Sequence, residues 1–424
     1  MATALATSIV ITVVLLLLVI LATTGKRLGT SRATAALVGV GYGLLLLVSI
    51  TGAGVDLSRA LGVVLLVAIV YPMVFFTRGT AANISRTVRG IVALILTAAL
   101  LALVAHMLSL IGWVLIPAAV IALAVAGAAM AVLGSERGTS RVARWGYWIT
   151  LVLSWLLAVI GAVLGGVELP SSLLAVESLP QGIYIAMALG VLALAAVDPL
   201  LRQSADDWGN GFPLGGLVLG AALMAGILAA PLLIFGGSFF VPSLPFFVGF
   251  GFVSASVVGV LLALGSLAII VLIPCYIAIA GKMLAQVVRL DGTEEKVSAE
   301  EEAKGATAGS MIMAALVAGS LAIAVSSPSV LVVVASLIAA AAGGAALSGI
   351  RPGLHVLASL FGAVVGVIPA AFTGGVEFFA WNWATGTGIV VAAVAGAVTA
   401  LVLGRAGSAS IENETASEVT EPVI

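Results

Sequence analysis

The stretch GSLAIIVLIPCYIAIAGKMLAQVVRLDGTEEKVSAEEEAK, residues 265–304, joins a long apolar run to the longest charged segment of the chain. The apolar run from Phe252 to Gly281 is long enough, at about 1.5 Å per helical residue, to cross the ~30 Å hydrocarbon layer of a membrane with some tilt. Because loops rich in Lys and Arg stay on the cytoplasmic side, the loop that follows is predicted to be cytoplasmic. Its basic residues are Lys282, Arg289, Lys296 and Lys304.

The composition of the whole chain is that of a polytopic membrane protein. Of its 424 residues, 62% are apolar and 8% are charged, whereas soluble domains contain roughly 45–50% apolar and about 25% charged residues. The net charge of -1 gives no basic surface for nucleic acid. A single cysteine and two histidines exclude a disulfide framework and a cysteine or histidine metal cluster.

Apolar runs bounded by polar residues predict about thirteen transmembrane helices. If successive loops lie on alternate sides of the membrane, every lysine and arginine except Arg59 falls on one side. This separation predicts a multi-pass plasma-membrane protein with its N-terminus outside and its C-terminus inside. The predicted spans cover residues 3–25, 33–55, 60–77, 90–111, 113–134, 145–167, 181–201, 214–236, 252–281, 306–326, 329–349, 354–374 and 384–404.

Residues 1–404 are therefore predicted to form one transmembrane domain. The tail 405–424, with its Ser, Thr and Glu residues, is predicted to be cytoplasmic and disordered. Small residues are abundant in the spans, as in AAAAGGAALSG at 339–349 and at Gly362 and Gly366. Because small residues let membrane helices approach closely, they predict a packed bundle.

No constellation of residues indicates an enzyme. The sequence has no convergent nucleophile, base or metal group, and no glycine-rich phosphate loop with its lysine. Neither catalysis nor ATP-driven transport is therefore expected from this chain. A secondary transporter fits better, because such proteins often bind solutes and ions where a membrane helix is broken.

The second span contains the segment GVGYG, in which Gly39, Gly41 and Gly43 surround Tyr42. The helix could unwind there and expose backbone groups to a solute. Close helix packing by the glycines is the interpretation we favour, because small-residue interfaces are common in membranes.

The seventh and ninth spans each contain a proline next to candidate site residues. In the ninth span, Pro274 precedes Cys275 and Tyr276, and its kink could free a carbonyl or be structural. In the seventh span, the segment VDPLLRQ places Asp198 four residues before Arg202. Asp198 could be a gate residue paired with Arg202, or it could lie at a solvated helix end, which we favour.

From the seventh span onward, the chain resembles the sodium/solute symporter family and, within it, the cation/acetate or monocarboxylate branch. LPQGIYIAMALGVLALAAVDPLLRQ (179–203) is similar to the seventh span of that branch. KMLAQVVRLDGTEEKVSAEEEAKGATAGSMIMAALVAGSLAIAV (282–325) is similar to its charged loop and tenth span. SPSVLVVVASLIAAAAGGAALSGIRPGLHVLASLFGAVVGV (327–367) is similar to the two spans that follow.

The resemblance implies an all-α integral membrane protein with a LeuT-like core, in which residues 33–167 and 181–349 form inverted repeats. It implies a solute and a coupling Na⁺ near broken second and seventh spans, with second-span carbonyls and ninth-span hydroxyls as sodium ligands. No other cofactor is implied. In this chain, IAIA at 277–280 stands where hydroxyls are expected, and Tyr42 and Ser49 are the side-chain oxygens near the second span.

The leading hypothesis is a cation-coupled symporter that moves a small organic solute, such as a monocarboxylate, by alternating access. The alternative is a transport-inactive scaffold or sensor that works with a membrane or signalling protein, because hydroxyl ligands and intramembrane polar groups are scarce. The central site is predicted at Gly39, Gly41, Tyr42, Ser49, Cys275 and Tyr276, with Asp198 and Arg202 as gate candidates.

Overall fold

The structure, a computed structural model, describes residues 32–50, 57–110, 136–165, 180–235, 268–273, 275–277, 279–280, 283, 328–371 and 380–418. The predicted spans at 3–25, 113–134 and 306–326 lie outside these residues, as do Pro274 and most of 252–281. The described helices are α2 (Arg32–Ile50), α3 (Leu57–Phe76), α4 (Arg78–Ala81), α5 (Arg86–Leu110), α7 (Glu136–Gly165), α8 (Gln181–Val197), α9 (Pro199–Trp208), the 3-10 turn η3 (Gly209–Gly211), α10 (Phe212–Phe235), α13 (Pro328–Ala346), α14 (Pro352–Ala371) and α15 (Trp383–Glu418). A further helical stretch, Ala268–Ile277, is called the ninth-span helix below.

The predicted fold class, an all-α membrane protein, is confirmed. Within the described residues, five helical segments are long and apolar enough to cross a membrane. One of them, Pro199–Ile227, is divided by Gly209, whose φ of 66° ends α9 in a conformation that favours glycine. Helices α9 and α10 are therefore separate, and the count of thirteen spans stays a prediction.

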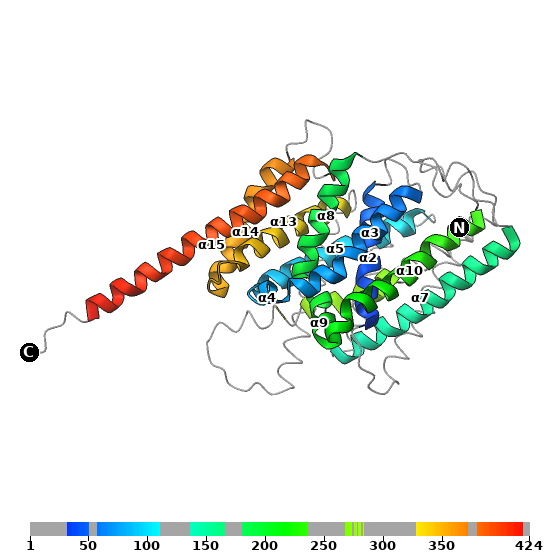
Figure 1. Cartoon of the computed structure of the whole chain (residues 1–424), viewed down its shortest axis with the longest axis horizontal. Coiled ribbons are helices and arrows are strands. Elements are labelled where there is room, and N and C mark those ends of the chain that lie inside the picture. The colour runs from blue at the N-terminus through cyan, green and yellow to red at the C-terminus, as the bar shows by residue number, and fades with distance from the viewer. Residues whose placement is uncertain are drawn as a thin grey trace, which may run out of the picture.

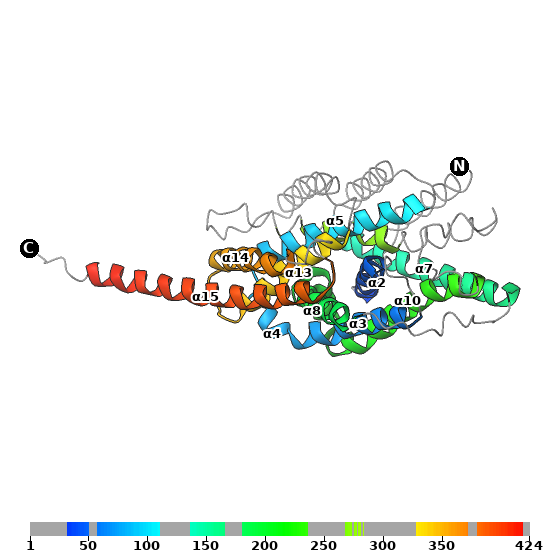
Figure 2. The ribbon, with the colours of Figure 1, turned by 90° about the horizontal axis from the view of Figure 1, so that it is seen from above.

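Helix α2 lies at the centre of the bundle, between α3, α5, α7 and α10 (Figure 2). Every described side chain from Ala33 to Leu46 is buried, as expected for a helix that is apolar on all sides. The helix runs without a break through GVGYG. The unwinding considered for the second span is therefore not found.

Side chains of neighbouring helices pack closely against the glycines of α2 instead. A side chain at Gly39 would overlap the hydroxyl of Tyr71, and one at Gly41 would come within 3.3 Å of Leu272. Tyr71 itself is held between Gly39 of α2 and two glycines of α10, Gly216 and Gly220. The glycines of the second span therefore serve helix packing, which is the interpretation that the sequence favoured.

Helices α13, α14 and α15 pack on one another beside α8, and α15 extends beyond the rest of the bundle (Figure 1). Helix α15 continues to Glu418 and so includes residues 405–418 of the predicted tail. The assignment of 405–424 as a disordered cytoplasmic tail stays a prediction. Extending an existing helix avoids the cost of nucleation. The alanines and glutamates of this segment also favour helix.

The outer faces of α14 and α15 are apolar and exposed. On α14 the exposed side chains recur every three or four residues, which places them on one stripe of the helix. Such a stripe faces lipid in a membrane bundle, so the bilayer is a partner of this chain. The stripe consists of Leu357, Phe361, Val364 and Ile368, and Val390, Val394, Val398 and Leu401 form its counterpart on α15.

The small residues at 339–349 and at Gly362 and Gly366 bring helices together, as predicted. A Cβ at Gly362 would lie 2.7 Å from the backbone nitrogen of Gly396, and one at Gly366 would lie 2.6 Å from the carbonyl oxygen of Gly388. A Cβ at Gly344 would overlap the carbonyl oxygen of Ala393. These contacts are with backbone atoms, which cannot move aside as a flexible side chain can.

Gly344→Ala is therefore expected to lower the stability of the bundle, because α13 and α15 must separate to admit one methyl group. Overpacking of this kind costs about 1–3 kcal/mol. A Cβ at the neighbouring Gly343 would meet nothing within 4 Å, so Gly343→Ala should be neutral or stabilising, by up to about 1 kcal/mol of helix propensity. Thermal unfolding of both variants in detergent measures the difference, and equal midpoints would contradict this packing.

Candidate functional site

The seventh span is broken at Asp198. Helix α8 ends at Val197, Asp198 has φ -55° and ψ 117°, and α9 begins at Pro199. A residue before proline avoids the helical conformation, and proline is favoured at the first position of a helix. The dipeptide Asp-Pro therefore ends one helix and begins the next, which gives the broken seventh span that the family resemblance implied.

Asp198 is fully buried, with no exposed surface. Its Oδ1 accepts hydrogen bonds from the backbone N–H groups of Leu200 (2.8 Å) and Leu201 (3.1 Å), and so caps α9. Its Oδ2 accepts hydrogen bonds from the hydroxyls of Tyr42 and Tyr276, the latter at 2.5 Å. Four hydrogen-bond donors therefore surround one carboxylate. We call Asp198, Tyr42 and Tyr276 the Asp198 cluster.

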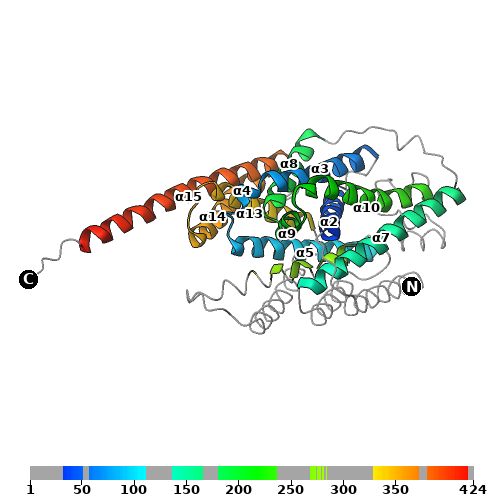
Figure 3. The ribbon, with the colours of Figure 1, turned by 60° about the horizontal axis from the view of Figure 1, so that its bottom comes forward.

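The Asp198 cluster joins three spans that are far apart in the sequence. Tyr42 comes from α2, Tyr276 from the ninth-span helix, and Asp198 from the break between α8 and α9. Helix α9 lies beside α2 (Figure 3), so the break between α8 and α9 lies next to the central helix. An ionisable group inside a membrane bundle is costly and tends to be functional, which makes this cluster the candidate site.

The favoured interpretation of Asp198 is wrong, and the pairing with Arg202 is not found. It is not at a solvated helix end, because it is buried among three spans. Nor does it form an ion pair with Arg202 in the described residues, since the charged partner of Arg202 is Asp206. The cause is local: as the N-cap of α9, Asp198 turns its carboxylate toward the first turn of that helix, whereas Arg202 lies a turn further on.

The contacts of the other predicted site residues are as follows. Gly39 and Gly41 are packed against Tyr71 and Leu272, as described above. Cys275 is buried next to Tyr276 in sequence, and its thiol lies 3.6 Å from the carbonyl oxygen of Val271 in its own helix. Ser49 belongs to α2, but its side chain lies outside the described residues.

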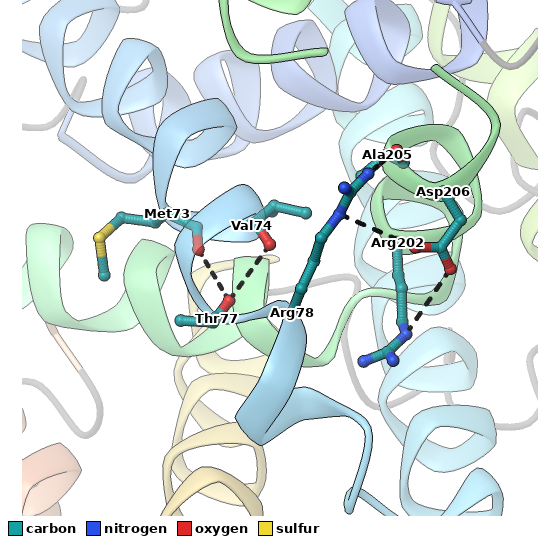
Figure 4. Close-up of polar contacts among 7 residues, drawn as sticks. All are labelled: Met73, Val74, Thr77, Arg78, Arg202, Ala205 and Asp206. Carbon is teal, nitrogen blue, oxygen red and sulfur yellow. Dashed lines mark hydrogen bonds and ion pairs between the residues drawn. The ribbon is translucent and has the colours of Figure 1, made fainter. Parts of the chain in front are cut away.

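A second polar cluster lies at the far end of α9 (Figure 4). Asp206 is 3.8 Å from Nε of Arg78 and 3.9 Å from Nε of Arg202. Arg78 also donates a hydrogen bond to the carbonyl of Ala205 near the C-terminal end of α9, and its guanidinium stacks 4.9 Å from the ring of Phe75. We call Arg78, Arg202 and Asp206 the arginine–aspartate cluster.

The arginine–aspartate cluster ties α4 to α9 with weak contacts. The side chain of Asp206 is 59% exposed, so water screens both ion pairs, and each contributes about 0–1 kcal/mol. Arg89 of α5 also lies close to Arg202 and Asp206. The arginines Arg78 of α4, Arg89 of α5 and Arg202 of α9 therefore gather near Asp206, while the predicted orientation of the chain in the membrane stays a prediction.

The sequence contained a signal for the Asp198 cluster. An Asp-Pro pair inside an apolar run marks a helix end followed by a capped helix start. The chain has only five tyrosines, and two of them meet at this carboxylate. The sequence could not show that the two tyrosines lie next to Asp198, because Tyr42 and Tyr276 are 156 and 78 residues away from it along the chain.

The described residues contain no group of three or more His, Cys, Asp or Glu side chains that could hold a metal ion. The second-span carbonyls and ninth-span hydroxyls that the resemblance implied as sodium ligands are not free or not present in the described residues. The carbonyls of α2 belong to an unbroken helix, and the described residues after Tyr276 are Ile277, Ile279 and Ala280.

No protein-family model matches the chain, and no curated protein matches it either. Among solved structures, the chain is similar to one described as the substrate-bound outward-open state of a Na⁺-coupled sialic acid symporter with a novel Na⁺ site. The similarity has a TM-score of 0.62 at 12% sequence identity, and it covers 94% of this chain and 97% of that one. The chain therefore has the fold of that membrane symporter.

Proposed function

We propose that this chain is a cation-coupled secondary transporter that moves a small organic solute by alternating access around the Asp198 cluster. The supporting observation is a buried carboxylate at a helix break, held by hydroxyls from two other spans. Transporters of this fold type bind solutes and ions where a membrane helix is interrupted. Tyr42, Tyr276 and Asp198 would then contact the solute or its coupling ion.

A monocarboxylate is the solute that we propose first, on the basis of the resemblance of the seventh to twelfth spans. An anionic solute next to Asp198 would meet a like charge, and no cationic side chain in the described residues is directed at that carboxylate. Two carboxylates share a buried site only if one of them carries a proton. We therefore propose that a monocarboxylate is bound together with one proton or one other cation.

The arginine–aspartate cluster is the gate that we propose at the predicted cytoplasmic end. Arg202 stays a gate residue, as the sequence suggested, but its partner is Asp206, and Arg78 of α4 completes the pairing. The weakness of these contacts suits a gate, because α9 must leave α4 at little cost when the path opens. The same helix carries Asp198 at its other end, so movement of α9 would disturb both clusters.

Arg78→Gln is expected to open this gate more often and to expose the interior from the cytoplasmic side. The only cysteine in the chain, Cys275, is buried next to Tyr276, so a maleimide added from that side reports the opening directly. Losing the hydrogen bond to Ala205 and the ion pair should raise the labelling rate about five- to tenfold.

The matched control for this labelling experiment is Arg351→Gln. Arg351 is an exposed arginine outside the cluster, so its loss should leave the labelling rate of Cys275 unchanged. A rate in Arg78→Gln no higher than in Arg351→Gln would remove the gate assignment. A bound solute should slow the labelling in all of these proteins if Cys275 lies near the path.

The alternative function is a transport-inactive scaffold or sensor. The observation in its favour is the scarcity of hydroxyl ligands in the described part of the ninth-span helix. Accumulation of a solute by the purified chain alone would exclude this alternative. Stable co-purification with another membrane protein, without any solute movement, would support it.

A further inference from the structure

We propose that Asp198 is the binding site of the coupling cation, and that this cation is a proton rather than Na⁺. The inference rests on the proposed function, because a coupling ion presupposes transport. The observation behind it is a fully buried carboxylate whose Oδ2 accepts hydrogen bonds from the hydroxyls of Tyr42 and Tyr276, which belong to two other helices.

The Oδ1 side of the carboxylate is closed to a metal cation. Two backbone N–H groups, those of Leu200 and Leu201, already donate to Oδ1 at 2.8 Å and 3.1 Å. Both belong to the first turn of α9, where the helix dipole presents its positive end. A cation placed at Oδ1 would therefore be repelled, which leaves Oδ2, whose two donors are hydroxyls that can rotate.

At Oδ2, a sodium ion would lack ligands. Hard cations need several oxygen atoms with free lone pairs, but both tyrosine hydroxyls direct their hydrogens at Oδ2. The carbonyls of α2 near Tyr42 are part of an unbroken helix. The residues on either side of Tyr276 are Cys275 and Ile277, neither of which has a hydroxyl. Sodium would have to turn both tyrosine hydroxyls away from Oδ2, and it would find no further hydroxyl among the described residues of the ninth-span helix.

A proton needs one lone pair, and the Asp198 cluster can accept it without losing a hydrogen bond. The proton forms one O–H bond at Oδ2, and no other covalent bond changes. The protonated Asp198 then donates a hydrogen bond to the hydroxyl of one tyrosine. That hydroxyl donates to the hydroxyl of the other tyrosine, and the second hydroxyl still donates to Oδ2. A tyrosine hydroxyl can both donate and accept, so all three groups stay bonded in either state.

Protonation also has a mechanical consequence for α9. A charged carboxylate makes stronger hydrogen bonds than a neutral carboxyl group, and it interacts favourably with the N-terminus of a helix. Neutral Asp198 would therefore hold α9 less tightly against Tyr42 of α2 and Tyr276 of the ninth-span helix. Proton binding and movement of α9 would be coupled through this one side chain.

Apart from Tyr42 and Tyr276, the charged and titratable side chains described on the neighbouring elements have partners other than Asp198. On α9 itself, Arg202 pairs with Asp206 at the other end of the helix. Helix α13 presents the uncharged Ser336 to α8. Of the remaining groups, Tyr71 of α3 donates to the carbonyl of Ala35, Arg89 of α5 lies close to Arg202 and Asp206, and Arg32 of α2 lies over the ring of Trp208.

Infrared difference spectroscopy of the purified chain in lipid tests the proposal with protons and sodium ions as the only probes. Acidification should produce the carbonyl stretch of a buried protonated carboxyl group. That band should be absent in Asp198→Asn and present in Asp207→Asn, which changes an exposed acid on the same helix. Replacing potassium by sodium should leave the band unchanged.

A second variant keeps the test decisive if Asp198→Asn does not fold. Tyr276→Phe removes one donor to the charged form, so the band should appear at a higher pH than in the wild type. No buried carboxyl band in the wild type, or its removal by sodium, would overturn the proposal.

A transport measurement separates this proposal from the proposed function. Solute accumulation driven by a pH gradient in sodium-free buffer supports both. Accumulation driven only by a sodium gradient would overturn proton coupling and leave the transporter standing. The infrared result does not depend on the solute, so it decides the proton site even where no solute moves.

Discussion

Asp198→Ala is expected to be the most destabilising single substitution at the candidate site. It removes the cap of α9 and leaves the N–H groups of Leu200 and Leu201 and two tyrosine hydroxyls without their acceptor. Loss of an N-cap costs about 0.5–2 kcal/mol, and each buried group left unpaired costs about 1–3 kcal/mol. Relief from burying a charge offsets part of this sum, so we expect a net loss of about 2–4 kcal/mol.

Thermal unfolding in detergent measures this loss. Asp198→Asn keeps one carbonyl oxygen as an acceptor and should lose less than Asp198→Ala. Asp207→Ala changes an exposed acid on the same helix and should stay within about 0.5 kcal/mol of the wild type. If Asp198→Ala and Asp207→Ala unfolded at the same temperature, Asp198 would not be the buried cap described here.

Tyr42→Phe and Tyr276→Phe are each expected to slow solute transport strongly. Each removes one hydrogen bond to a charged group, worth about 1.5–3 kcal/mol, which corresponds to about tenfold or more in an equilibrium constant. Both hydroxyls donate to the same oxygen, Oδ2. Their effects should therefore be coupled, and the double variant should lose less than the product of the two single losses.

Initial rates of solute exchange in proteoliposomes give this double-mutant cycle. Tyr147→Phe is the matched control, because the hydroxyl of Tyr147 donates to the carbonyl of Leu219 at 3.0 Å, away from Asp198. It should affect stability slightly and transport little. Strictly multiplicative losses for Tyr42 and Tyr276, or unchanged rates in both single variants, would remove the Asp198 cluster from the transport path.

The features that sequence reasoning predicted correctly are those set by composition and by local chemistry. An apolar chain with small residues at 339–349, Gly362 and Gly366 predicted closely packed membrane helices, and the backbone contacts of α13, α14 and α15 confirm it. The preference for glycine packing over unwinding in the second span was also right. Each of these depends on residue type and spacing within one or two helices.

The failures concern positions whose neighbours come from distant parts of the chain. Asp198 looked like a solvated helix end because charged residues follow it, but folding places tyrosines from two other spans around it. The family resemblance implied breaks in the second and seventh spans. The seventh is interrupted at Asp198, whereas α2 is unbroken, and its Gly39 and Gly41 pack against Tyr71 and Leu272.

The most direct test of proton-coupled transport is uptake of labelled acetate, propionate and pyruvate into proteoliposomes that contain the purified chain alone. An inward proton gradient and an inward sodium gradient are imposed separately. We expect accumulation of at least one solute under the proton gradient without sodium, and its loss in Asp198→Asn. Failure of folded protein to accumulate any of the three solutes under either gradient would contradict monocarboxylate transport and favour the transport-inactive scaffold.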